Sequence, residues 1–228
     1  MSDKNLNEVS PACRQLYKIG RTLLEQGNLT DAIEVLNQIL NDEPGLVAGR
    51  ESLRTAELAR AERNEGFFKH QFEEIGGAAL LVEAELCLGA HPLKAMGLAE
   101  QVLNHEPKNI GAHKIFAKAA LKAGLPRTAL LSLNFVFSHA PETPDVALEM
   151  VSALKQAGRA TEALAICGRL LKDYPGNKRV VRTMGSLYSS ERSRLASALP
   201  SRGHYDPNAA SRRVSDICKA SPTRTVIS

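Results

Sequence analysis

Apolar residues recur at helical spacing through much of the sequence, in segments that each end at a proline. Each segment has apolar residues four, five, eight and twelve positions before its proline. The four sets are Leu40, Ile39, Leu36 and Ala32 before Pro44; Leu103, Val102, Ala99 and Ala95 before Pro107; Phe137, Val136, Leu133 and Ala129 before Pro141; and Leu171, Leu170, Cys167 and Ala163 before Pro175. Because the residue before a proline is disfavoured in a helix, each set predicts an amphipathic helix that ends close to its proline.

A second amphipathic helix is expected upstream of each proline-ended helix. Its apolar residues lie four positions apart, in the pairs Ile19 and Leu23, Val82 and Leu86, Phe116 and Ala120, and Met150 and Leu154. A small residue follows each pair where the chain has to reverse: Gly27, Ala90, Gly124 or Gly158. The pattern therefore predicts consecutive helix pairs and no β-sheet.

The alanine twelve residues before each proline has a physical role in this arrangement. A methyl side chain lets two helices approach near the short end of the usual 8–10 Å separation. A larger residue there would overpack the contact, at a cost of about 1–3 kcal/mol. We expect these alanines to lie where the two helices of a pair touch.

The spacing of the prolines carries a resemblance to a known family. Pro107, Pro141 and Pro175 follow one another at intervals of 34 residues, whereas Pro44 lies 63 residues before Pro107. In these features the chain resembles the tetratricopeptide repeat family, whose repeat is a helix-turn-helix with small residues at the helix contact and a proline at its end. The resemblance covers residues 13–46, 76–109, 110–143 and 144–177, and it implies an all-α, right-handed solenoid of antiparallel helix pairs.

The first helices depart from the family pattern at two positions. The aromatic residue that often begins this helix is replaced by Leu16, Ala79, His113 or Ala147. The small residue of mid-helix is kept at Gly20 and Ala117 but becomes Glu83 and Val151. The spans 76–109 and 144–177 depart at both positions, and the span 76–109, with the charged Glu83 in mid-helix, matches the pattern least.

The sequence predicts six parts along the chain. They are a lead-in (1–12), a first repeat (13–46), a partial or divergent repeat and connector (47–75), three contiguous repeats (76–177), a capping helix (178–199) and a disordered basic tail (200–228). The connector holds the densest aromatic cluster, Phe67, Phe68 and Phe72. These rings either fill the seam after the first repeat or form an exposed docking patch.

Composition and charge refine this description. Hydrophobic residues make up 43% of the chain, aromatic residues 4%, and tryptophan is absent, which favours a core of closely packed helices. Residues 178–228 contain 10 Lys or Arg against 3 Asp or Glu, although the whole chain has a net charge of only +4. The rest of the chain is thus mildly acidic, and the basic end is expected to have a partner of its own.

The sequence contains none of the motifs that would indicate an enzyme. A phosphate-cradling glycine loop, HExxH and GxSxG are all missing. The four cysteines lie 74, 80 and 51 residues apart, too far for the close pairs of zinc or redox sites. We expect no metal, no cofactor and no catalysis, and reduced thiols in a cytoplasmic protein. The N-terminus has no apolar signal region and no segment approaches 18 apolar residues, so neither secretion nor membrane spanning is expected.

The resemblance implies a protein-binding groove lined by the first helices of successive repeats. Lys114, Lys118 and Lys122 recur every four residues and so lie on one side of a helix whose other side packs. Other expected groove residues are Tyr17, Arg21, Ser152, Lys155, Arg179 and Arg182. Such a groove would be basic and would favour an acidic segment or a free C-terminal carboxylate. The alternative for the lysine row is a solvated helix face.

Some family members clamp a terminal carboxylate with a lysine and an asparagine one turn apart. The counterpart pairs here are Tyr17 with Arg21 and Lys114 with Lys118, which favours a looser electrostatic site. The expected function is therefore that of a non-enzymatic adaptor or scaffold that binds a peptide or helix. The alternative function is nucleic-acid or anionic-surface binding through the basic C-terminal region.

Overall fold

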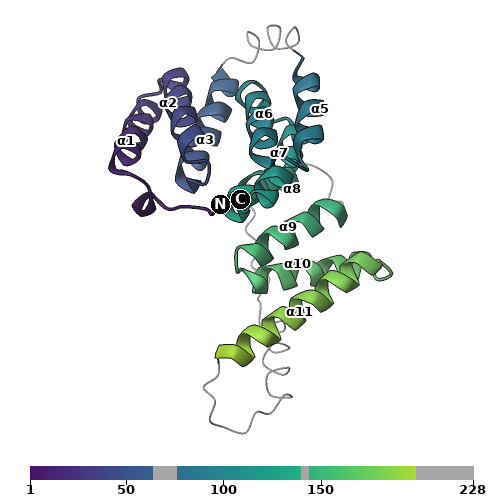
Figure 1. Ribbon diagram of the computed structural model, residues 1–228. Coiled ribbons are helices and arrows are strands. Elements are labelled where there is room, and N and C mark those ends of the chain that lie inside the picture. Colours follow the sequence, from purple (N-terminus) through teal and green to yellow (C-terminus); the bar gives the residue numbers. More distant parts are fainter. Residues whose placement is uncertain (64–75, 140–143, 199–228) are drawn as a thin grey trace. The chain divides into compact units, whose positions relative to one another are not determined.

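The computed structural model describes residues 1–63, 76–139 and 144–198. Residues 64–75, with the three phenylalanines, and residues 199–228, with the basic tail, lie outside the described part, so the expectations for them stay predictions. Within the described ranges the chain forms α-helices and one three-residue 3-10 helix, with no β-strand (Figure 1). The prediction of an all-α fold built from helix pairs is confirmed.

Figure 1 labels the helices in chain order. The elements are η1 (Leu6–Glu8), α1 (Pro11–Glu25), α2 (Leu29–Asp42), α3 (Val47–Arg63), α5 (Gly77–Cys87), α6 (Pro92–His105), α7 (Ile110–Lys122), α8 (Pro126–His139), α9 (Pro144–Gln156), α10 (Ala160–Asp173) and α11 (Lys178–Ala198). Each of the four spans that resemble a repeat holds two of these helices.

Proline and glycine set the helix ends, as the sequence indicates. Helices α2, α6 and α10 each end two residues before a proline, at Pro44, Pro107 and Pro175. Gly27, Gly124 and Gly158 have φ between 74° and 77°, a left-handed conformation that side chains disfavour. These glycines let the chain turn sharply between α1 and α2, α7 and α8, and α9 and α10.

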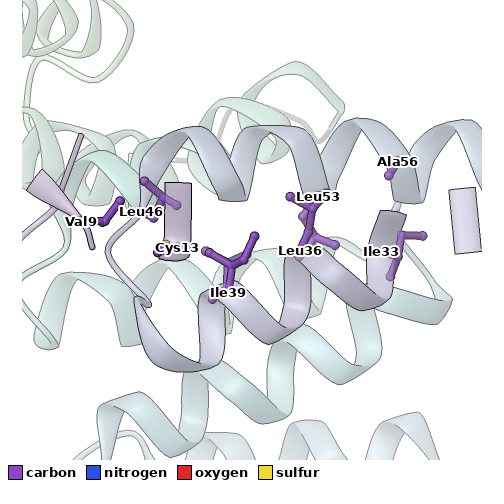
Figure 2. Close-up of a cluster of buried hydrophobic side chains, with 9 residues drawn as sticks. Val9, Cys13, Ile33, Leu36, Ile39, Leu46, Leu53 and Ala56 are labelled. Atoms are coloured by element: carbon purple, nitrogen blue, oxygen red, sulfur yellow. The ribbon is translucent and has the colours of Figure 1, made fainter. Parts of the chain in front are cut away.

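The chain forms two compact units, Met1–Ala153 and Leu154–Ser228. In the first unit, α1, α2 and α3 enclose a hydrophobic cluster in which Leu36, Ile39 and Leu53 are at most 1% exposed (Figure 2). The remaining buried members are Val9, Cys13, Ile33, Leu40, Leu46 and Ala56. The alanines at the helix contacts, Ala32, Ala95 and Ala129, are completely buried, as expected.

The N-terminal residues tie two distant parts of the first unit together. Asp3 caps α8: its Oδ1 accepts hydrogen bonds from the Thr128 backbone N–H at 3.1 Å and hydroxyl at 2.7 Å, and its Oδ2 accepts from the Arg127 N–H at 2.6 Å. Lys4 Nζ lies 2.6 Å from Glu43 Oε2, just after α2. The sequence pattern identified this segment only as a lead-in.

Helix α5 packs with a different face from the one that the apolar pattern indicated. Val82 and Leu86, expected in the core, are 62% and 80% exposed, while Ala84 and Leu88 are buried. Every side of this helix except the positions of its glutamates is apolar, so either face can pack. Glu83 occupies the mid-helix position that holds Gly20 in the first repeat and Ala117 in the third, and a carboxylate is costly to bury between helices. This charge explains why the expected face is turned outward.

The second unit contains α10, α11 and the last residues of α9. Ala163, Cys167 and Leu170 of α10 are buried, and so are Val180 and Leu187 of α11. No helix in the parts of the chain that the structure describes is both long enough and apolar enough to span a membrane.

Candidate protein-binding surface

Helix α7 separates its packing residues from a row of lysines. Phe116, Ala117 and Ala120 are fully buried, whereas Lys114 and Lys118 are half-buried and Lys122 is exposed. The Asn109 side chain caps the helix by accepting a hydrogen bond from the Ala112 N–H at 2.9 Å. The helix therefore holds the lysines on its open side, as the four-residue spacing predicts.

Acidic residues of two neighbouring helices lie beside these lysines. Lys118 Nζ is 4.0 Å from Glu85 Oε1 of α5, and both side chains are substantially exposed. Glu149 of α9 is half-buried, and burial raises the pKa of its carboxyl, against the opposing effect of Lys118 and Lys114. The surface across α5, α7 and α9 thus carries both signs of charge rather than the uniformly basic character expected from the sequence.

The two expected groove residues of α1 already have partners within the first unit. The Tyr17 hydroxyl lies 3.3 Å from Ser52 Oγ of α3, and Ser52 is buried. Arg21 Nη2 is 3.1 Å from Glu25 Oε1 within α1. No contact in the described residues joins this pair to the lysines of α7.

The other expected groove residues lie on α9 and α11. Ser152 is exposed near the end of the first unit. In the second unit, Lys155 donates a hydrogen bond to Ser186 Oγ of α11 at 3.0 Å, and Arg179 and Arg182 are exposed. The structure therefore brings Lys155 to α11 and the α7 lysines to Glu85 and Glu149.

A buried cluster of charges, which the sequence pattern did not reveal, joins α3 to α6 and α7. Glu100 of α6 lies 3.0 Å from Arg50 and 2.7 Å from Arg54, and Arg54 also lies 2.6 Å from Glu57. Both guanidinium groups stack over the ring of Phe116, at 5.0 and 5.2 Å. Arg50, Arg54 and Glu57 are spaced four and three residues apart on one side of α3, which was the available signal.

Burial controls the protonation of this cluster. Burial raises the pKa of Glu57 to about 7, and it outweighs the opposing effect of Arg54. Burial also disfavours the charged form of Glu100, but Arg54 and Arg50 together hold the pKa of that carboxyl below its usual value. One oxygen of each carboxylate and the Nε of each arginine have no hydrogen-bond partner. The cluster is therefore held by charge pairing with incomplete hydrogen bonding.

His113 occupies the family's aromatic position and is tied into the structure. Its Nε2 lies 2.9 Å from the Pro107 carbonyl and its Nδ1 3.1 Å from Ser132 Oγ, so Nε2 donates and Nδ1 accepts. Its ring stacks on Phe135, with centroids 4.2 Å apart, beside a cavity of about 270 Å³. Burial, followed by the charge of Arg54, lowers the pKa of His113 to about 4. A neutral histidine with both nitrogens engaged has a structural role here.

The residues that the structure describes contain no group of three or more His, Cys, Asp or Glu side chains placed to hold a metal ion. Cys13, Cys87 and Cys167 are unpaired thiols, and burial raises the pKa of Cys13 and of Cys167. The fourth cysteine and most of the basic end, on which the alternative of nucleic-acid binding depends, lie outside the described residues.

Comparisons with known proteins relate the chain to one family and to several solved structures. The sequence profile of the tetratricopeptide repeat matches residues 16–45 and 145–177. Among solved structures, a thermophilic tetratricopeptide repeat protein from Thermus thermophilus is 18% identical, with 80% of this chain and 84% of that chain covered and a TM-score of 0.39. No curated protein matches the chain.

Two MamA structures are also similar. An RS-1 MamA double mutant is 12% identical, with 92% and 94% of the two chains covered and a TM-score of 0.43. An MSR-1 MamA is 14% identical, with 92% and 98% covered and a TM-score of 0.42. Because these TM-scores are low, the family assignment depends on the sequence matches and on the helix pairs of this chain. The two matched spans, together with the proline-ended helix pairs and the buried alanines at their contacts, support a protein of the tetratricopeptide repeat family.

Proposed function

We propose that the chain is a non-enzymatic adaptor that binds a segment of another protein on the open side of α7. Repeat proteins of this kind use extended surfaces across successive repeats to bind protein partners. Lys114, Lys118 and Lys122 form the main contact, and Glu85 and Glu149 lie beside them. The fold supports protein binding in general, and the position of the site is our proposal.

The observation that carries the proposal is the weak pairing of the lysine row. Lys118 and Glu85 are 4.0 Å apart, with side-chain exposures of 38% and 54%. Exposed pairs of this kind contribute only about 0.2–1 kcal/mol, so a carboxylate of a ligand can replace Glu85 at little cost. Side chains of α7 that point toward the core are by contrast fully buried. One side of α7 is therefore packed in the core, and the other side carries lysines whose weak ion pairs a ligand can replace.

The proposed ligand is an acidic segment or a free C-terminal carboxylate. Its carboxylates pair with the α7 lysines, and a single basic residue in the segment meets Glu149. Tyr17, Arg21 and Ser152, which lie in the same unit as α7, remain secondary members of the proposed surface. The lack of an asparagine one turn from Lys114 favours recognition by charge over a specific clamp.

Reversing the charge of the lysine row is expected to weaken ligand binding about ten-fold or more, because several ion pairs are lost together. Phage-displayed random peptides are selected on the full chain, and the affinity of the selected peptides is measured by fluorescence anisotropy. The test variant is Lys114→Glu with Lys118→Glu and Lys122→Glu. We expect selection of acidic peptides and an unchanged helical circular dichroism signal.

The matched control replaces three exposed lysines elsewhere, Lys18→Glu, Lys108→Glu and Lys172→Glu, which changes the net charge equally. This control is expected to bind the selected peptides with an affinity close to that of the original chain. Equal binding by the folded test variant, or equal loss in both variants, would contradict the proposed site.

A further inference from the structure

Helix α5 presents an apolar stripe to solvent. Val82 and Leu86 lie four residues apart on this helix and are 62% and 80% exposed, and the adjacent Ala78 and Ala79 are exposed as well. Residues at this spacing share one side of a helix. An exposed apolar stripe of this kind is a candidate surface for packing against another molecule.

The same positions in the next two repeats show what such a stripe packs against. One repeat on, Phe116 and Ala120 of α7 are fully buried; two repeats on, Met150 and Leu154 of α9 are 8% and 4% exposed. In a repeat array this side of a first helix contacts a neighbouring helix. The stripe on α5 therefore has the geometry of a helix-packing surface that no described residue of the chain covers.

Two carboxylates restrict which helix fits this surface. Glu83 and Glu85 flank the stripe of α5, whereas the equivalent positions of α7 are Ala117 and Ala119. Glu83 pairs with Lys94 at 2.7 Å and Glu85 with Lys118 at 4.0 Å, and all four side chains are substantially exposed. A helix that covers Val82 and Leu86 must bring apolar residues flanked by positive charges.

Helix α11 has this combination on its outer side. Val180 and Leu187 are buried, while Val181 and Tyr188, seven residues apart, are 52% and 36% exposed. Lys178 and Arg182 lie next to Val181 on the same side and are exposed. The first turns of α11 contain no acidic residue. Its outer side therefore complements the α5 surface in apolar character and in the sign of its charges.

We propose that α11 of one copy of this chain packs on α5 of a second copy. Val181 and Tyr188 then cover Val82 and Leu86, and Lys178 and Arg182 pair with Glu83 and Glu85. Because the two contacting surfaces are different, each copy carries one of each and can bind two neighbours or one reciprocal partner.

Charge reversal on each surface tests this proposal directly. Light scattering after size-exclusion chromatography measures the mass of the full chain at rising concentration and at low and high salt. We expect the average mass to increase with concentration, and to do so more at low salt, where charge pairs are least screened. Glu83→Lys with Glu85→Lys, or Lys178→Glu with Arg182→Glu, should weaken association at least ten-fold.

Mixing provides the decisive control. An equimolar mixture of the two reversed variants should assemble again, because the basic α11 of one meets the acidic α5 of the other and the reversed surfaces also match. Reversal of two exposed glutamates elsewhere, Glu34→Lys with Glu62→Lys, should leave association unchanged. A wild-type chain that remains monomeric overturns the proposal, and so does a mixture that fails to assemble.

Discussion

Replacing Glu100 with alanine is expected to lower the free energy of unfolding by about 3–5 kcal/mol, because it leaves two buried arginines without their shared partner. Glu100 is 7% exposed and lies 3.0 Å from Arg50 and 2.7 Å from Arg54. Both guanidinium groups pack over Phe116, and the side chains of Arg50 and Arg54 are only 3% and 12% exposed. Urea unfolding followed by circular dichroism measures the change.

Glu162 of α10 offers a matched control for this experiment. It pairs with Arg159 three residues earlier, at 2.6 Å, but both side chains are about half exposed. Its replacement by alanine should lower the free energy of unfolding by less than about 1 kcal/mol. Similar small effects of both substitutions would show that the buried cluster is not what holds α3 against α6 and α7.

Stability should also depend on pH through two buried groups that act in opposite directions. The pKa of Glu57 is about 7 in the folded chain against an ordinary value of 4.5, so its contribution is complete below pH 4.5 and is lost as the pH rises through 7. The pKa of His113 is about 4 against 6.5, so its contribution is complete above pH 6.5 and is lost as the pH falls through 4. Between these limits the two effects largely cancel.

Single substitutions separate the two effects. Glu57→Gln keeps a neutral side chain of the same shape, so the remaining effect of His113 makes stability rise between pH 4.5 and 6.5. His113→Gln keeps a donor near Nε2, so the remaining effect of Glu57 makes stability fall as the pH increases toward 7. Each difference from the original chain is on the order of 3 kcal/mol across its window. Urea unfolding at a series of pH values measures it.

The structure identifies the charged groups around Glu57 and His113, so the effect of each substitution can be assigned to its own site. Arg54, Glu100 and Arg50 face Glu57, and Arg54, Glu100 and His139 face His113. Slopes that do not change sign between Glu57→Gln and His113→Gln would show that these residues do not control the pH dependence.

Helix pairing could be predicted from the sequence because local chemistry determines it. A proline two residues after α2, α6 and α10 stops each helix, and a glycine with positive φ reverses the chain after α1, α7 and α9. The buried alanines then follow from the need for close helix contact. These features depend on residues that are near one another in the chain, and such local relations can be recognised from the spacing of residues in the sequence.

The packing of α3 and α5 could not be predicted in the same way. On α5 the apolar pattern has no single side, and the position of one carboxylate, Glu83, decides which face is exposed. On α3 the arginines and glutamate resemble solvent-exposed residues until Glu100, more than forty positions away, is placed beside them. The spacing of Arg50, Arg54 and Glu57 places them on one side of α3, but it does not indicate that Glu100 pairs with them.

The row of lysines on α7 could be predicted from the sequence, but the acidic residues that lie beside it could not. The spacing of Lys114, Lys118 and Lys122 placed them on the open side of α7, where the structure has them. Glu85 and Glu149 come from separate helices and became neighbours of the lysines only when the repeats packed together. The residue pattern of one helix therefore predicts which of its own side chains share a face. It does not predict which residues of neighbouring helices lie beside them.

Hydrogen–deuterium exchange of the full chain, with and without a selected acidic peptide, tests the central claim most directly, because it locates a bound ligand without any substitution. We predict that the peptide slows exchange in α7, at residues 110–122, and in the adjoining parts of α5 and α9. Protection that spares α7 and falls instead on α11 or on residues 199–228 would contradict the proposal that this chain binds its partner through the lysine row.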